Sequence, residues 1–177
     1  MAETKEGGAK FLGGRKGLLF AAGAALLLCV LAVPVLLLAF VGQTVGVVGE
    51  GMSPALKDGD RVFVSRRVGE LRRGDIVIFY HPLDSSKSYI KRVVGLPGET
   101  LALRAGKTFV NGVPLEEPYL DPRLNEAPDD YGPVRVGAGE YFLMGDNRDN
   151  SADSRHLGPV RESRIYGRVV GRYWPPR

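Results

Sequence analysis

The segment YIKRVVGLPGE, residues 89–99, has the alternating side chains of a β-strand. In an extended chain Tyr89, Lys91 and Val93 share one face. A lysine between an aromatic ring and a valine can lose its hydration, which lowers a lysine pKa by up to about 3–5 units. A neutral Lys91 amine would then be competent as a general base near neutral pH. The alternative is a surface lysine on an edge strand, where its charge blocks aggregation.

Short segments rich in Val, Ile, Tyr and Phe recur after residue 42, and Gly, Asp and Pro bound them. The predicted strands are Thr44–Val48, Arg61–Val64, Asp75–Tyr80, Tyr89–Gly95, Thr100–Arg104, Thr108–Val110, Val113–Leu115, Glu140–Met144 and Ile165–Tyr173. Asn111-Gly112 is a two-residue hairpin signal, and the Pro-rich, acidic segment Glu116–Gly132 is predicted to be a surface loop. We therefore expect a mainly β domain with a curved or barrel-like antiparallel sheet.

Residues 17–41 form an uncharged, apolar run of 25 residues. About 20 apolar residues suffice to cross a bilayer core as a helix, whereas a cleaved secretory signal has an apolar core of only about 7–15. Basic residues favour the cytoplasmic side, and here Lys5, Lys10, Arg15 and Lys16 precede the run. We expect a cytoplasmic tail at 1–16, a transmembrane anchor at 17–41 and an exported β-rich domain at 42–177. The chain would be a single-pass protein of the cell membrane.

The remaining composition argues against several classes of function. The single cysteine, Cys29, lies inside the apolar run, so it forms no disulfide within the chain and completes no zinc site with His81 and His156. In an exported, anchored domain the net charge of +4 favours contact with anionic lipid over nucleic acid. We expect no metal, no cofactor and no nucleic-acid partner.

The segment GDNRDNSADSR, residues 145–155, is dense in short polar side chains. If it is extended, Ser151, Asp153 and Arg155 share a face. Asp153 would then pair with Arg155, and the Ser151 hydroxyl would orient an amine. A turn rich in Asn and Asp that bond to their own backbone is the alternative. A calcium loop is disfavoured because Arg148 stands two residues after Asp146, where a ligand is needed.

Three segments, GDIVIF (residues 74–79), YIKRVVGLPGE and GDNRDNSADSR, follow the apolar run in this order. Together they resemble the signature segments of the bacterial type I signal peptidases, a Ser/Lys protease family. The resemblance implies a mainly β domain outside the cytoplasmic membrane and a serine-type endopeptidase, a hydrolase that removes signal peptides after small residues. The implied partners are preprotein signal peptides and membrane lipid.

The resemblance also implies roles for individual residues. Lys91 corresponds to the general base and Ser151 to the hydroxyl that orients it, with Asp153 and Arg155 as structural support. The implied substrate-binding residues are Met52, Tyr89 and Ile90.

The segment VVGEGMSPALKDGD, residues 47–60, departs from the family pattern. The family places its nucleophilic serine directly before the methionine, and here Gly51 stands before Met52. Ser53 is close in sequence, but in an extended chain it lies about 6.6 Å from position 51. Misplacement by about 1 Å already costs catalysis. However, the glycine frees the loop, and a shift could bring Ser53 toward Lys91.

The sequence leaves several interpretations of this site open. Ser53 is a possible substitute nucleophile, and a water activated by Lys91 is another. A third is a catalytically inactive signal-peptidase-like protein that holds preproteins or assists an active homologue. A self-cleaving repressor with the same Ser/Lys chemistry is disfavoured by the apolar run and by the missing DNA-binding helices.

Overall fold

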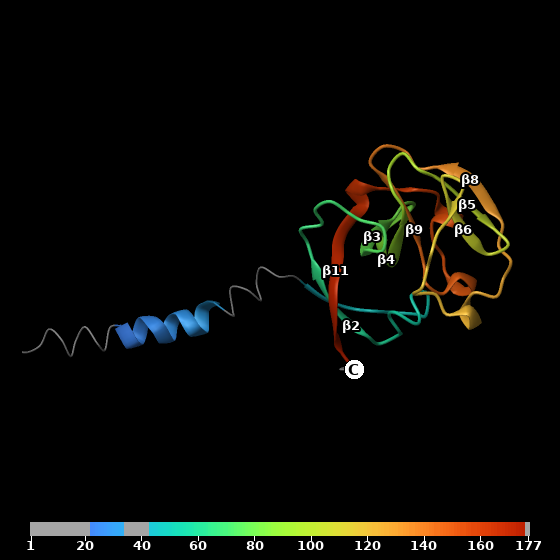
Figure 1. The fold of residues 1–177 in the computed structure, drawn as a ribbon. Coiled ribbons are helices and arrows are strands. Elements are labelled where there is room, and N and C mark those ends of the chain that lie inside the picture. Colours follow the sequence, from blue (N-terminus) through green and yellow to red (C-terminus); the bar gives the residue numbers. More distant parts are fainter. Residues whose placement is uncertain (1–21, 34–42, 176–177) are drawn as a thin grey trace, which may run out of the picture. The chain divides into compact units, whose positions relative to one another are not determined.

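The computed structural model of the chain describes residues 22–33 and 43–175 (Figure 1). The chain divides into two units, residues 1–40 and 41–177. In the first unit, residues 22–33 are helical. Their large side chains are exposed, for example Leu26 at 67% and Leu31 at 61%.

The predicted transmembrane anchor, residues 17–41, is described only in its middle part. Residues 17–21 and 34–41 lie outside the described residues, as does the predicted tail at 1–16. Within the described residues, no helix combines the length and apolar character needed to cross a membrane. The anchor therefore stays a prediction.

The second unit is built on an antiparallel sheet of seven strands. In spatial order these are β1 (Gln43–Gly46), β2 (Arg61–Ser65), β11 (Ile165–Trp174), β3 (Ile76–His81), β4 (Asp84–Gly95), β9 (Glu140–Met144) and β10 (Val160–Arg161). Six of the predicted strands belong to this sheet, and most of their ends lie within two residues of the observed ones. The strand that begins at Tyr89 in the prediction begins at Asp84 in β4. The short strand β10 was not predicted.

A second antiparallel sheet has four strands and lies to one side of the domain (Figure 1). Its order is β7 (Val113–Pro114), β6 (Lys107–Val110), β5 (Thr100–Arg104) and β8 (Tyr131–Arg135). Asn111 and Gly112 both have positive φ and join Val110 to its partner Val113 as the predicted two-residue turn. The fold class is confirmed as mainly β and antiparallel.

The edge strand β8 corrects the predicted loop Glu116–Gly132. Tyr131 and Gly132 belong to β8, which Pro133 interrupts without losing its pairing to β5. Proline is tolerated at a sheet edge because one side of the strand needs no ladder donor. The remaining helical turns are η1 (Pro122–Leu124), η2 (Arg148–Asn150), α2 (Ser154–Leu157) and η3 (Glu162–Arg164).

Three buried apolar clusters hold these elements together. One joins the two sheets by packing Val94 of β4 and Phe142 of β9 against Leu101 of β5. Another packs Met52 and Leu56, in the loop between β1 and β2, onto the larger sheet. This second cluster fixes the loop that contains Gly51.

The junction between the sheets leaves no room for a side chain at residue 95. A Cβ added to Gly95 would lie 2.8 Å from Cβ of Phe142 and 3.2 Å from Leu101 Cδ1. We expect Gly95→Ala to lower the free energy of unfolding by about 1–3 kcal/mol, as overpacking does. Melting temperatures compare it with Gly171→Ala, whose added Cβ meets nothing within 4 Å. Equal melting temperatures for the two variants would contradict this packing.

Candidate active site

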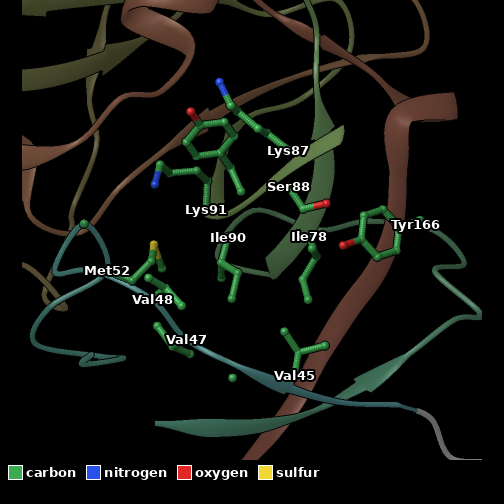
Figure 2. A pocket seen from close by; sticks show the side chains of 14 residues that line it. Val45, Val47, Val48, Met52, Ile78, Lys87, Ser88, Ile90, Lys91 and Tyr166 are labelled. Atoms are coloured by element: carbon green, nitrogen blue, oxygen red, sulfur yellow. The ribbon is translucent and has the colours of Figure 1, made fainter. Parts of the chain in front are cut away.

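A largely apolar groove of about 470 Å³ opens on the larger sheet (Figure 2). Its lining includes Val45, Val47, Val48, Gly51, Met52, Ile78, Lys87, Ser88, Tyr89, Ile90, Lys91 and Tyr166. In Figure 2 Lys91 and Tyr166 lie on opposite sides of the view, with Ile78 and Ile90 between them. Five of the residues singled out in the sequence therefore line one groove: Gly51, Met52, Tyr89, Ile90 and Lys91.

Lys91 is a buried lysine in the wall of this groove. It lies in β4 opposite Val77 of β3, and only 6% of its surface is exposed. Its Nζ lies 5.7 Å from the centre of the Tyr89 ring, which shares its strand face as predicted. Burial lowers the pKa of the Lys91 amine, and the negative charges of Asp153 and Asp146 oppose that shift. The amine therefore loses its proton more easily than an exposed lysine.

Gly51 lies directly beside this amine. A Cβ added at Gly51 would be 3.3 Å from Lys91 Nζ, 3.4 Å from the carbonyl oxygen of Asn150 and 3.8 Å from Ser151 Oγ. Gly51 is not among the residues with positive φ, so its backbone conformation accepts a side chain. The site thus brings the predicted nucleophile position, the predicted base and Ser151 together.

Ser53 is oriented differently from Gly51. The chain turns here, because the Ser53 N–H donates to the Glu50 carbonyl at 3.0 Å and the Leu56 N–H donates to the Met52 carbonyl at 2.9 Å. The Ser53 hydroxyl is buried and donates to the Glu50 carboxylate. Ser53 lines a second hollow, together with Lys57 and Asn147, and not the groove of Lys91. The extended-chain estimate of the spacing therefore does not apply to this loop.

Ser151 approaches Gly51 because residue 145 is a glycine. A Cβ on Gly145 would lie 2.2 Å from Ser151 Oγ and 2.3 Å from the Gly51 carbonyl oxygen. Both distances are too short for non-bonded atoms, so only glycine fits at residue 145 in this arrangement. The Asn147 N–H donates to that same carbonyl at 3.3 Å. The Ser151 oxygen itself is buried and has no hydrogen-bond partner among the described residues.

Asp153 and Arg155 brace the loop behind Ser151. Asp153 accepts the Gly145 N–H at 3.0 Å, and its carboxylate pairs with Arg155 at 2.9 Å. Arg155 also donates to the Arg148 carbonyl at 2.7 Å and pairs with Asp129. Burial alone would raise the pKa of the Asp153 carboxyl, but Arg155 and the backbone donors outweigh it, and the pKa is lowered. Asp153 is therefore a charged carboxylate at neutral pH.

Two further ion pairs were not anticipated from the sequence. Arg92 donates to both oxygens of the buried Asp146, at 2.8 and 2.5 Å. Arg148, also buried, pairs with Glu117 at 2.5 Å. The sequence did hold a clue to these pairs, because an arginine inside a buried segment needs an acidic partner. However, the partner Glu117 lies in the segment predicted to be a surface loop.

Metal binding has no clear support in this region. Within residues 22–33 and 43–175, no three His, Cys, Asp or Glu side chains come together as a metal site requires. The expected lack of a metal and of a cofactor stays a prediction.

The domain thus combines two antiparallel sheets, an apolar groove and a buried lysine in the groove wall. Residues 19–174 match the family model described as signal peptidase, peptidase S26. The chain belongs to the signal peptidase I family of serine peptidases.

Individual relatives agree with this assignment. Signal peptidase I T of Bacillus subtilis (strain 168) is 46% identical over 130 residues, 67% of each chain. Signal peptidase I of Leptolyngbya laminosa is 40% identical over 149 residues, 77% of this chain and 70% of the relative. A crystal structure of a signal peptidase I from Enterococcus faecalis V583 superposes with a TM-score of 0.51 at 32% identity, covering 58% of this chain and 98% of that one.

The burial of Lys91 makes a prediction about stability and pH. Because its pKa is lowered on folding, the folded state releases this proton before the unfolded state does. The cost of burying the charge is greatest at low pH and fades as pH rises toward 10.5, the ordinary lysine value. Lys91→Met should therefore melt a few degrees above the parent at pH 6. That gain should shrink steadily to pH 10, as thermal melting in detergent will show. A gain that does not depend on pH would refute a lowered pKa.

Proposed function

We propose that this chain is a membrane-anchored signal peptidase that removes signal peptides from exported preproteins, with Lys91 as general base. The observation that carries the proposal is the buried Lys91 amine in the groove wall, 3.3 Å from where a Cβ at residue 51 would lie. A general base must lie within hydrogen-bond reach of the proton that it removes. The direct test is to incubate purified protein with a preprotein whose signal ends in Ala-x-Ala.

The substrate would occupy the groove. Met52, Tyr89 and Ile90 line it and supply mainly apolar surface for the small residues that precede the cleavage point. A volume of about 470 Å³ lies in the usual range of ligand sites. Ser151 would orient the Lys91 amine, while Asp153 and Arg155 would hold the loop that carries Ser151 in place. The proposed chemistry requires no metal or cofactor.

The membrane anchor would be residues 17–41, with residues 1–16 inside the cell and residues 42–177 outside. The uncharged run of 25 residues supports it, as do the exposed leucines of residues 22–33. The basic residues before the run support the orientation. In this arrangement the groove meets preproteins as they emerge, and membrane lipid is a constant partner.

A second candidate function follows from Gly51, which offers no hydroxyl to the Lys91 amine. The chain would then be an inactive signal-peptidase-like protein that holds preproteins in its groove or assists an active homologue. Binding of a preprotein without any cleavage by the purified chain would favour this second function.

Lys91 is predicted to be essential for cleavage. Lys91→Ala should lower the rate by at least about 10²-fold, because it removes the general base. Lys91→Arg should be as damaging, because a guanidinium stays charged. The parent's rate should rise with pH as the lowered pKa of Lys91 is passed. Cleavage of a purified preprotein, followed between pH 6 and 10, measures all three. An arginine variant as fast as the parent would remove Lys91 from this role.

A serine at residue 51 is predicted to increase cleavage. Gly51→Ser would put a hydroxyl beside the Lys91 amine, in a backbone conformation that accepts it. The nearest atom to the new Cβ is Lys91 Nζ. It ends a flexible side chain, so the lysine should make room at little cost. We expect the rate to rise by at least about tenfold, because a positioned nucleophile is highly effective. Cleavage rates and melting temperatures of Gly51→Ser and of the parent test this prediction. A well-folded variant with no gain would show that residue 51 is not presented to Lys91.

The orientation of the chain is testable from outside the cell. Arg123 is 85% exposed and lies between Glu116 and Gly132. Trypsin added to intact cells should cut after Arg123, and Arg123→Gln should remove that cut. An epitope on residues 1–16 should survive the same treatment. Loss of the epitope while the 116–132 segment stays intact would mean the opposite orientation.

A further inference from the structure

Three polar groups surround the side of Gly51 on which a side chain would lie. They are Lys91 Nζ, the Asn150 carbonyl oxygen and Ser151 Oγ, at 3.3, 3.4 and 3.8 Å from a Cβ built there. Lys91 and the Ser151 oxygen are buried, and that oxygen has no hydrogen-bond partner among the described residues. Buried polar atoms nearly always have a partner, and an ordered water with two to four polar neighbours commonly supplies it.

We infer that these three groups bind a water molecule beside Gly51, and that this water is the nucleophile of peptide cleavage. The inference rests on the proposed function and specifies its reacting group. The chain would hydrolyse its substrate directly, without forming an acyl-enzyme.

The hydrogen-bonding capacities of the three groups complement those of water. A water molecule donates two hydrogens, one to the Asn150 carbonyl and one to the lone pair of a neutral Lys91 amine. The Ser151 hydroxyl donates to the water oxygen and so gains the partner that it otherwise lacks. One lone pair of the water then stays free to attack the substrate carbonyl. Ser151 acts here as a positioning residue.

The nearby hydroxyl of Ser53 does not compete for this role. It donates to the Glu50 carboxylate and lies among the residues of the second hollow. Reaching Lys91 would require breaking that hydrogen bond and reversing a turn that the buried Met52 and Leu56 hold in place. Glycine at residue 51 leaves the three polar groups uncovered by a side chain, whereas a methyl group there would lie against them.

The chemical step balances with the groups present. Lys91 accepts a proton from the water as the water oxygen bonds to the carbonyl carbon of the scissile peptide. The tetrahedral intermediate collapses, the C–N bond breaks, and the Lys91 ammonium returns the proton to the departing amine. The products are a carboxylic acid and a free N-terminus, and Lys91 is neutral again.

The test uses the full chain in detergent, with a preprotein ending in Ala-x-Ala and three variants of glycine. Gly51→Ala puts a methyl group against the proposed water and adds no nucleophile. Gly51→Ser adds a nucleophile at the same position. Gly171→Ala is the matched control, because its added Cβ meets nothing within 4 Å. Melting temperatures verify that each variant is folded.

A second measurement distinguishes direct hydrolysis from an acyl-enzyme. A peptide with a free amine and the N-terminal sequence of the mature protein is added in excess. An acyl-enzyme transfers its acyl group to such an amine and gives a new peptide, which mass spectrometry detects. Direct attack by water gives only the acid. Gly51→Ser serves as the positive control for transfer.

The inference predicts that the parent and Gly171→Ala cleave at equal rates without transfer. Gly51→Ala should be slower by at least about 10²-fold while folded, in line with loss of the reacting group. Gly51→Ser should give the transfer product. A transfer product from the parent, or a Gly51→Ala variant as fast as the parent, would overturn the inference.

Cleavage by Gly51→Ser alone would also overturn it, while leaving the groove and Lys91 as a working peptidase site. If Gly51→Ser too fails to cleave, the proposed peptidase function fails together with the inference.

Discussion

The close packing of Gly145 against Ser151 and the Gly51 carbonyl is the constraint on which the site depends. A Cβ at residue 145 would overlap both, at 2.2 and 2.3 Å. Three segments far apart in sequence meet there: the loop after β1, the strand β4 and the loop after β9. Close-packed interiors transmit such steric limits with little relaxation. The spacing between Ser151 and residue 51 is therefore set by a glycine that carries no reactive group.

Charge arranged around this packing determines the state of Lys91. Burial favours the neutral amine, and Asp153 and Asp146 favour the ammonium. Those carboxylates are themselves committed to arginines, Asp153 to Arg155 and Asp146 to Arg92. Buried pairs of this kind are costly to break, because the remaining partner keeps an uncompensated charge. The network thus keeps the loop in one conformation. Because the arginines offset the charge of Asp153 and Asp146, these carboxylates stabilise the Lys91 ammonium less.

How much the sequence revealed differs between kinds of interaction. Thr100–Arg104 and Glu140–Met144 were predicted with the bounds that the strands have, because alternation and turn residues are local signals. The neighbours of Lys91 on its strand face left two interpretations open, a desolvated base and a surface lysine, and the structure has the buried lysine. The strand β8 was missed because Gly132-Pro133 has the composition of a loop, and only its pairing with β5 defines it. The pairing of Arg148 with Glu117 joins residues 31 positions apart, which no local pattern encodes.

The direction of the Ser53 side chain was equally inaccessible from the sequence. The sequence argument assumed an extended chain, whereas backbone hydrogen bonds close a turn between Glu50 and Leu56. This turn places the Ser53 hydroxyl outside the groove of Lys91. The turn itself depends on the burial of Met52 and Leu56 in the core.

That anchoring of the loop has an evolutionary consequence. Because Met52 and Leu56 hold the backbone, the conformation of residue 51 does not depend on its own side chain. Glycine and serine codons can be one nucleotide apart, so a single mutation exchanges them without a new fold or a compensating change elsewhere. Under the proposed function, the nucleophile of this scaffold would change in one genetic step, while the groove is inherited intact.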